Sequence, residues 1–225
     1  MMKTLTMLML LVTAPFVYGA GSGSMGGGSP SAGGDMPAAR KTPQQMAASS
    51  YNAGLNHKKR AQDYEAKAAK AKNDGDRDKQ LAKAKSQYED AVEDYKKSIS
   101  YDRSAYQAMN ELGYAWRKSG DYDSALRAYN AALAVKPDFP PALEYRGETY
   151  LALARFKDVK DAYLALVRTD QDQAAALMVA MEAWQETHPE NTTAEAKEFI
   201  AWLQERKAVA ANTVSLSTNN VHPWN

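Results

Sequence analysis

The chain has 225 residues, and its 28 lysine and arginine residues nearly balance 27 aspartate and glutamate residues, for a formal net charge of +1. This balance gives no global reason to expect binding to nucleic acid or to a membrane surface. The absence of cysteine excludes a disulfide framework, a thiolate nucleophile and a cysteine-ligated zinc site.

Residues 1–20 have the pattern of a secretory signal peptide. Lys3 supplies a short positive region, and the apolar run over residues 5–17 is shorter than a typical membrane-spanning helix. Cleavage is expected after Gly19, Ala20 or Ser22. We therefore expect export, most simply to the periplasm of a Gram-negative bacterium, with secretion as the alternative and no stable membrane insertion after cleavage. An uncleaved amphipathic start or an anchor is the other interpretation.

Residues 21–43 are rich in glycine, serine, alanine and proline, with almost no large apolar side chain. Such a segment cannot bury enough surface to offset the entropy of ordering it. The composition predicts a flexible linker, whose role would be that of a tether.

Residues 44–105 have the pattern of a long helical hairpin. The first part, to Lys72, is rich in the helix formers alanine, lysine, glutamine and glutamate, and Asn73-Asp74-Gly75 marks the expected reversal. On the return, apolar and small residues alternate at spacings of four and three, as in a heptad seam. These residues are Leu81, Ala84, Tyr88, Ala91, Tyr95 and Ser98.

Residues 106–139 have the pattern of two shorter antiparallel helices. Met109 and Trp116 lie on one helical face, Gly120 is suited to the left-handed end of the first helix, and Pro137 ends the second. Gly113 lies inside the first helix, where glycine costs about 1 kcal/mol relative to alanine. Its presence there needs a structural reason.

This pattern returns at a fixed spacing along the chain. Gly113 corresponds to Gly147, and Tyr129 corresponds to Tyr163 on one side and to Tyr95 on the other. The common period, about 34 residues for each helix–turn–helix unit, is typical of tetratricopeptide repeats (TPRs), and the chain resembles this family. The resemblance implies a solenoid of helix pairs, in which Gly113 lets the second helix approach closely against Ala125.

The resemblance also organises the flanking segments. Residues 44–105 would be a degenerate first repeat, in which Gly54 takes the role of Gly113. The stretch from Gly54 to Tyr88 is much longer than that from Gly113 to Tyr122, so a long insertion is expected in the first helix pair. Residues 140–173 would be a degenerate repeat after the central one, because three of its positions depart from the pattern. These are Arg146, Val159 and Gln171.

Residues 174–207 are predicted to form a pair of capping helices, separated at His188-Pro189. A solenoid needs a terminal unit to cover its last apolar face, and Trp184 and Phe199 belong to apolar stripes suited to that role. Residues 208–225 are polar and predicted to be disordered. The fold class is therefore all-α: a short TPR-like helical solenoid with an extended N-terminal helical hairpin and a C-terminal capping helix pair.

The sequence contains no recognisable catalytic or metal-ligating set. His57, His188 and His222 are far apart, and His57 follows a polar helical pattern that predicts solvent exposure. No glycine-flanked nucleophile or phosphate-binding loop is present. We therefore predict that the chain is not an enzyme and uses no cofactor or metal.

The resemblance implies surface recognition of a protein or peptide, because the first helices of TPR arrays line a concave groove. The matching residues would contact the partner, although each is also compatible with an ordinary solvated position. They are Gln107, Asn110, Tyr114, Arg117, Lys118, Glu144 and Glu148, with Leu151 beside them. The clamp with which some family members hold a terminal carboxylate is not expected, since Glu111, Pro141 and Tyr145 occupy its positions.

Charge is unevenly distributed despite the neutral total. The first hairpin is rich in lysine and the C-terminal part is rich in glutamate. These charges are either ordinary solvated helix surfaces or surfaces that bind a partner of opposite charge. Two functions follow. The first is a non-catalytic TPR scaffold in the cell envelope that binds a peptide or partner protein in the groove. The alternative is a structural or assembly factor that self-associates or docks its long hairpin on an envelope or secretion complex.

Overall fold

The computed structural model describes residues 40–190 and 193–219, with side chains up to Val209. The predicted signal peptide and the linker up to residue 39 lie outside the described residues. Within the described part, all regular structure is helical. The helices are α1 (Pro43–Ala69), α2 (Asp74–Tyr101), α3 (Tyr106–Ser119), α4 (Tyr122–Val135), α5 (Pro140–Ala152), α6 (Phe156–Thr169), α7 (Gln171–Thr187) and α8 (Ala194–Asn219).

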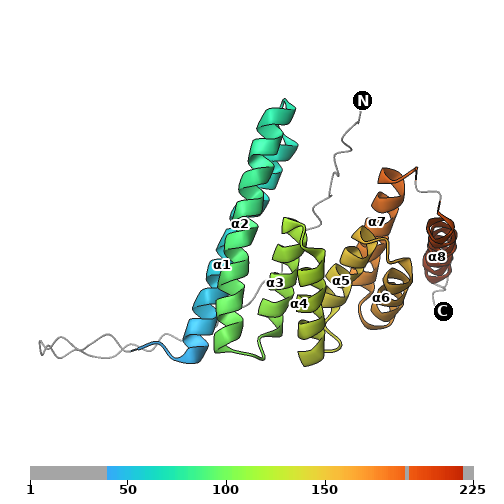
Figure 1. Cartoon of the computed structure of the whole chain (residues 1–225). Coiled ribbons are helices and arrows are strands. Elements are labelled where there is room, and N and C mark those ends of the chain that lie inside the picture. Colours follow the sequence, from blue (N-terminus) through green and yellow to red (C-terminus); the bar gives the residue numbers. More distant parts are fainter. Residues whose placement is uncertain (1–39, 191–192, 220–225) are drawn as a thin grey trace, which may run out of the picture.

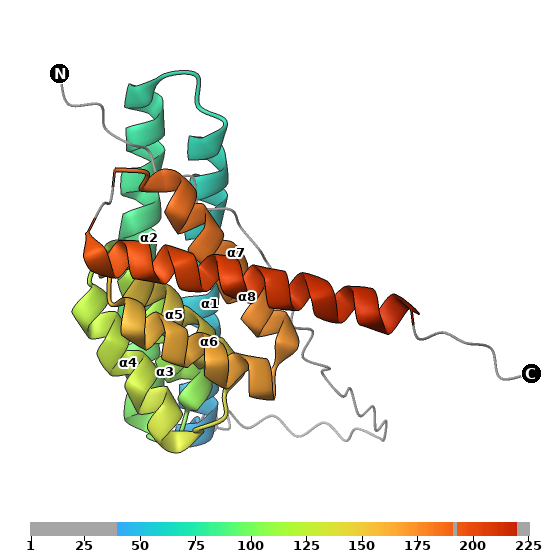
Figure 2. The same ribbon diagram turned by 90° about the vertical axis from the view of Figure 1, so that its right-hand side faces the viewer.

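The helices form a row of antiparallel pairs. α1 packs on α2, α3 on α4 and α5 on α6, and each pair also contacts the next through α2–α3, α4–α5 and α5–α7. Figure 1 shows this row, with the α1–α2 hairpin extending beyond the other pairs at one end. Helix α8 lies across the far end of the row and touches α6 and α7 over a short stretch (Figure 2). The predicted all-α solenoid, with an extended first hairpin and a terminal helix pair, is confirmed.

Local capping sets both ends of the first hairpin. Thr42 and Gln45 form a reciprocal capping box at the start of α1, with Pro43 at its first position. The chain reverses over residues 70–73, and Asn73 caps α2 by accepting a hydrogen bond from the Asp76 amide at 2.8 Å. The expected turn at Asn73-Asp74-Gly75 is thus displaced, because Asn73 acts as an N-cap and the next two residues are already helical.

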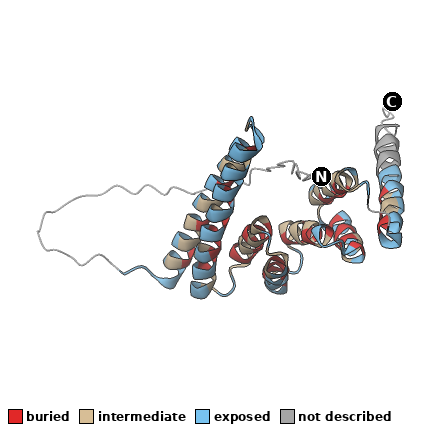
Figure 3. Ribbon diagram, turned by 45° about the horizontal axis from the view of Figure 1, so that its top comes forward, coloured by how far each residue is buried: buried red, intermediate tan, exposed pale blue. Residues whose placement is uncertain are grey.

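The seam predicted for the returning helix is buried along most of its length. Ala84, Tyr88, Ala91, Tyr95 and Ser98 are all buried, and the Ser98 hydroxyl donates to the Ala47 carbonyl at 2.9 Å. Leu81 is the exception and is 42% exposed. The hairpin extends past α3 at this level, so no third helix covers it, and Figure 3 shows an exposed surface there.

Two glycines explain the close approach of paired helices. A Cβ atom on Gly113 would lie 2.6 Å from Cε1 of Tyr129, and one on Gly54 would lie 2.5 Å from Cε1 of Tyr95. The close approach expected at Gly113 is present, and the atoms nearest to this position belong to the Tyr129 ring rather than to Ala125. The stretch from Gly54 to Tyr95 is longer than that from Gly113 to Tyr129, which places the insertion expected from the sequence in the first pair.

The turn between paired helices also repeats with the period of the helix pairs. Gly120 ends α3 with φ 91°, and Ala154, at the equivalent position of the next pair, follows α5 with φ 54°. The next amide in each case donates back to the first helix, from Asp121 to Trp116 and from Arg155 to Tyr150. The second turn thus keeps the left-handed geometry without glycine, at a steric cost that glycine avoids.

The apolar interior consists of two clusters joined at the α2–α3–α5 junction. One fills the first hairpin and reaches Tyr114 and Ala115, and the other runs from Met109 to Leu203. Trp116 and Tyr145 pack against both clusters. The chain is therefore one continuous solenoid, in which the central unit depends on its neighbours on both sides.

The C-terminal helix is longer than predicted. The ring of Phe199 in α8 stacks on that of Phe156 with 4.8 Å between the ring centres, and its centre lies 5.8 Å from that of the Trp184 ring. The start of α8 therefore covers the apolar end of the preceding helices. The helix then continues to Asn219, whereas disorder was expected from residue 208. The stretch from 208 to 219 contains no glycine or proline to end a helix, since the next proline is Pro223. Among the described helices, none combines the length and apolar character needed to cross a membrane.

Replacing Gly113 by alanine should destabilise the fold by about 1–3 kcal/mol, because the fully buried Tyr129 ring has no space to withdraw. Gly75→Ala is the matched control. Its Cβ would lie 3.5 Å from the nearest atom, so the alanine should stabilise α2 by up to about 1 kcal/mol. Urea unfolding followed by circular dichroism measures both. Equal effects of the two substitutions would contradict the packing role of Gly113.

Candidate functional site

The first helices of the four pairs lie side by side and form a single surface. α3 contacts α5, α5 contacts α7, and side chains of α1 reach α3. We call the surface formed by α1, α3, α5 and α7 the first-helix face. It carries all seven residues that the sequence predicted as partner contacts.

The predicted contact residues differ widely in accessibility. Asn110, Tyr114, Arg117 and Glu144 are buried, so their side chains lie beneath this face rather than on it. Gln107, Lys118 and Glu148 are only partly buried. Leu151, expected beside them, is also buried. Their role in binding stays a prediction, but burial limits direct contact to the second group.

Ion pairs tie the first helices together. Lys58 of α1 bonds Glu111 of α3 at 2.7 Å, Lys118 of α3 bonds Glu65 of α1 at 2.7 Å, and Arg117 of α3 pairs with Glu148 of α5. All six side chains are largely shielded from solvent, so screening weakens these pairs less than exposed ones. We call these three pairs the ion-pair ladder.

Sequence reasoning missed Lys58 and Glu65 as members of this surface, and it placed Glu111 there only as a residue at one of the clamp positions. A signal was present, because Lys58 and Glu65 on α1 have the same spacing as Glu111 and Lys118 on α3, with the opposite order of charge. Two helices aligned in register then match each cation with an anion. Without a structure, the register of α1 on α3 was unknown, because the insertion in the first pair obscured it.

Arg117 occupies an aromatic and acidic pocket between α3 and α5. Its guanidinium carbon lies 5.4 Å from the centre of the Tyr114 ring and 5.5 Å from that of Tyr145. Such cation–π contacts favour a cation that is removed from water. The same ring system links the units, since Tyr114 lies 5.2 Å from Tyr145 and 6.0 Å from Tyr88 of α2.

Glu144 is the unusual acid of this pocket. Its side chain is buried, and its Oε2 atom has no hydrogen-bond partner in the described structure. Burial, with the adjacent charge of Glu148, raises the pKa of Glu144 well above its usual value, and Arg117 only partly opposes this. The protonated form of Glu144 is therefore favoured beside the Arg117–Glu148 pair.

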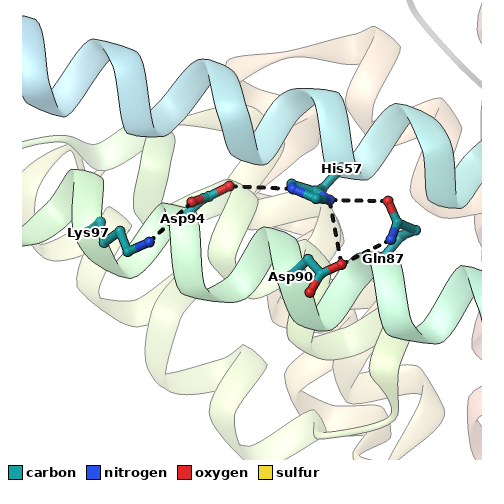
Figure 4. A network of polar contacts seen from close by, with 5 residues as sticks. All are labelled: His57, Gln87, Asp90, Asp94 and Lys97. Atoms are coloured by element: carbon teal, nitrogen blue, oxygen red, sulfur yellow. Dashed lines mark hydrogen bonds and ion pairs between the residues drawn. The ribbon is translucent and has the colours of Figure 1, made fainter.

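His57 is held between the first two helices rather than exposed as predicted. Its Nδ1 lies 3.1 Å from Oε1 of Gln87 and 3.6 Å from Oδ2 of Asp90, and its Nε2 lies 3.7 Å from Oδ2 of Asp94. Figure 4 shows how these side chains surround the ring. Its side chain is 26% exposed. Across the described ranges, no group of three or more histidine, cysteine or acidic residues has the geometry to hold a metal ion. These polar contacts join α1 to α2, which is a structural role for His57 within the hairpin.

The row of antiparallel helix pairs and the shared surface of their first helices are the features of a helical repeat protein. Two sequence profiles, both described as tetratricopeptide repeat, match residues 80–138 and 117–181. Residues 80–181 of the chain therefore contain tetratricopeptide repeats. Proteins of this family are generally non-catalytic interaction modules, and the chain is accordingly a protein–protein interaction scaffold. The comparison with curated proteins found no match.

Solved structures similar to this chain are repeat proteins of low sequence identity. The first TPR of Spaghetti (RPAP3), bound to the HSP90 peptide SRMEEVD, is 16% identical, with 70% of this chain and 95% of that chain covered and a TM-score of 0.37. MamA is 18% identical, with 74% and 94% covered and a TM-score of 0.42. A tetratricopeptide repeat protein from Parabacteroides merdae is 13% identical, with 74% and 67% covered and a TM-score of 0.41.

Replacing Glu144 by glutamine should stabilise the protein relative to the parent as pH rises. Because the folded-state pKa of Glu144 is raised, its favourable contribution is fully present below about pH 4.5, the ordinary glutamate value, and is lost as pH rises through the folded pKa. Glutamine does not titrate and avoids this loss. Urea unfolding at pH 4 and pH 8 measures the difference between variant and parent.

Glu186→Gln is the control for loss of a carboxylate, because Glu186 is exposed and lies outside the pocket. The gain in free energy of unfolding relative to the parent, on going from pH 4 to pH 8, should appear for Glu144→Gln and be much smaller for Glu186→Gln. A difference between Glu144→Gln and the parent that stays constant or shrinks with pH would show that Glu144 is not protonated in the folded state.

Proposed function

We propose that this protein is an exported, non-catalytic scaffold that binds a peptide or a partner protein on the first-helix face. The observation that carries the proposal is the ion-pair ladder, which holds α1, α3 and α5 in one fixed register. A surface fixed before binding loses little conformational entropy when a partner docks. An ordered face of this kind suits an extended peptide or a helix laid across several repeats.

The contact residues divide into two roles in this proposal. Gln107, Lys118 and Glu148 keep part of their surface exposed and would meet the partner. Arg117 and Glu144 lie beneath them and would set the position of Glu148. We propose no clamp for a terminal carboxylate. One of the clamp positions is occupied by the acidic residue Glu111, and Glu111 forms an ion pair with Lys58, so the positive charge of Lys58 is already neutralised.

Partner binding is tested by placing a photo-crosslinking amino acid at Gln107, and separately at exposed Asp123 of α4 as the control. In envelope fractions of the source cell, the Gln107 position should yield discrete crosslinked products that the Asp123 position lacks. The same products from both positions, or products from Asp123 alone, would place binding elsewhere. Absence of any product from Gln107 would also contradict the proposal.

Export is the second part of the proposal, and it rests on the sequence of residues 1–20. The short positive region, the apolar run and the small residues after it are those of a cleavable signal, and residues 21–43 would then tether the folded part. The periplasm of a Gram-negative bacterium is the proposed compartment, with secretion as the alternative.

Purified protein from a Gram-negative host should begin at Ala20, Gly21 or Gly23 and fractionate outside the cytoplasm, because signal cleavage accompanies export. Leu8→Arg in the apolar run should block both cleavage and export, whereas Ser29→Arg in the linker should leave cleavage and export unchanged. N-terminal sequencing with cell fractionation provides the measurement. Retention of the N-terminal region in a cytoplasmic product would overturn the export proposal.

A further inference from the structure

The end of the first hairpin carries lysines that the fold does not use. Between Lys67 and Lys85 the sequence has seven basic and three acidic residues, a net charge of +4. We call this segment the hairpin tip. Six exposed lysines in it have no carboxylate partner among the described residues. They are Lys67, Lys70, Lys72, Lys79, Lys83 and Lys85.

The acids of the hairpin tip are already engaged locally. Arg77 pairs with Asp74 at 2.9 Å and lies 3.8 Å from Asp78, while Asp76 accepts a hydrogen bond from the Asn73 side chain. Two of the lysines, Lys67 and Lys83, lie over the ring of Tyr64 at 5.0 Å and 5.5 Å. The positive charge of the tip is therefore concentrated rather than cancelled within the hairpin.

The opposite charge gathers around the connection between α7 and α8. Between Glu182 and Glu198 the sequence has five acidic residues and one lysine, a net charge of −4. We call the five glutamates of this stretch, Glu182, Glu186, Glu190, Glu195 and Glu198, the acidic corner. Glu182 and Glu198 pair with Lys207 and Lys160. Glu186, Glu190 and Glu195 are exposed and have no ion-pair partner in the part of the chain that the structure describes.

The two charged segments lie on one side of the molecule but at opposite ends of the row of helices. In Figure 1 the α1–α2 connection is at the top, at the end of the hairpin that begins the row, and the C-terminal end of α7 is at the upper right. Figure 2 likewise places both in the upper half. The length of the row separates them, so the tip cannot reach the corner of its own chain. A second copy is needed to bring them together.

We propose that the protein forms a two-fold symmetric dimer in which the hairpin tip of each copy docks on the acidic corner of the other. A two-fold rotation that exchanges the ends of the row brings both tip–corner pairs together at once, so the contact closes and does not propagate into a filament. In each contact the six unpaired lysines of one tip meet Glu186, Glu190 and Glu195 of the other copy, the corner glutamates that no lysine or arginine pairs with among the described residues. This inference is independent of partner binding on the first-helix face.

The contact should be strongly dependent on salt, because the six unpaired lysines and the three unpaired glutamates are exposed. Sedimentation velocity of the purified protein should show a dimer at about 30 mM salt and a monomer at about 500 mM, where the range of electrostatic attraction falls to a few ångströms. A parent protein that stays monomeric at low salt overturns the proposal. So does a dimer that salt leaves unchanged.

Charge reversal gives the sharper test. The tip-reversed variant carries Lys72→Glu, Lys79→Glu and Lys85→Glu, and the corner-reversed variant carries Glu186→Lys, Glu190→Lys and Glu195→Lys. Each alone should be monomeric at low salt, with at least about a tenfold loss of dimer affinity, because its tip and corner then have the same sign. An equimolar mixture should form a heterodimer, because both contacts again pair opposite charges.

The control variant carries Lys97→Glu, Lys136→Glu and Lys157→Glu, which change the net charge by the same amount outside the tip. It should still dimerise, and circular dichroism should show that all variants are folded. Dimerisation of either reversed variant alone, or failure of the mixture to associate, overturns the proposal. A parent that is monomeric but binds anionic phospholipid vesicles through the tip would identify a membrane as the occupant and also overturn it.

Discussion

The packing of a tyrosine ring on a glycine of the preceding helix is the constraint on which the solenoid depends. Tyr129 lies against Gly113 and Tyr95 against Gly54, each so close that a methyl group on the glycine would overlap the ring. This contact sets the distance within each of the first two helix pairs. In the third pair Gly147 instead faces Leu177 of α7, and Tyr163 turns toward Trp202 at 5.6 Å. In this pair the closest contact of the glycine is therefore with α7 of the terminal helix pair, and not with the tyrosine of its own pair.

Once the pairs are fixed, aromatic and charged side chains join them into a row. Tyr114 bridges the rings of Tyr88 and Tyr145, and the ion-pair ladder aligns α1, α3 and α5. Buried ion pairs are weak evidence for stability, because desolvation offsets their attraction. Their effect here is to select one register between parallel helices, which apolar contacts alone specify less strictly. A fixed register is also what a binding surface requires.

The candidate site and the charged ends of the row occupy different parts of the molecule. The first-helix face carries its charges in pairs, so recognition there would rest on shape and on a few partly exposed polar groups. The hairpin tip carries six exposed lysines and the acidic corner three exposed glutamates that have no ion-pair partner among the described residues. Self-association and partner binding therefore do not compete for the same residues, and an assembly of two copies would leave two first-helix faces.

The sequence by itself determined the helical pairs, their regular period, the insertion in the first pair and the apolar seam, because each depends on spacing along the chain. It also placed Gly113 and Gly54 as equivalent. Only the tertiary structure decided that Gly113 meets Tyr129, that Asn110, Arg117 and Glu144 lie beneath the surface, and that Lys58 and Glu65 belong to it. Burial and cross-helix pairing depend on the register between helices far apart in sequence, which periodicity within one helix does not contain.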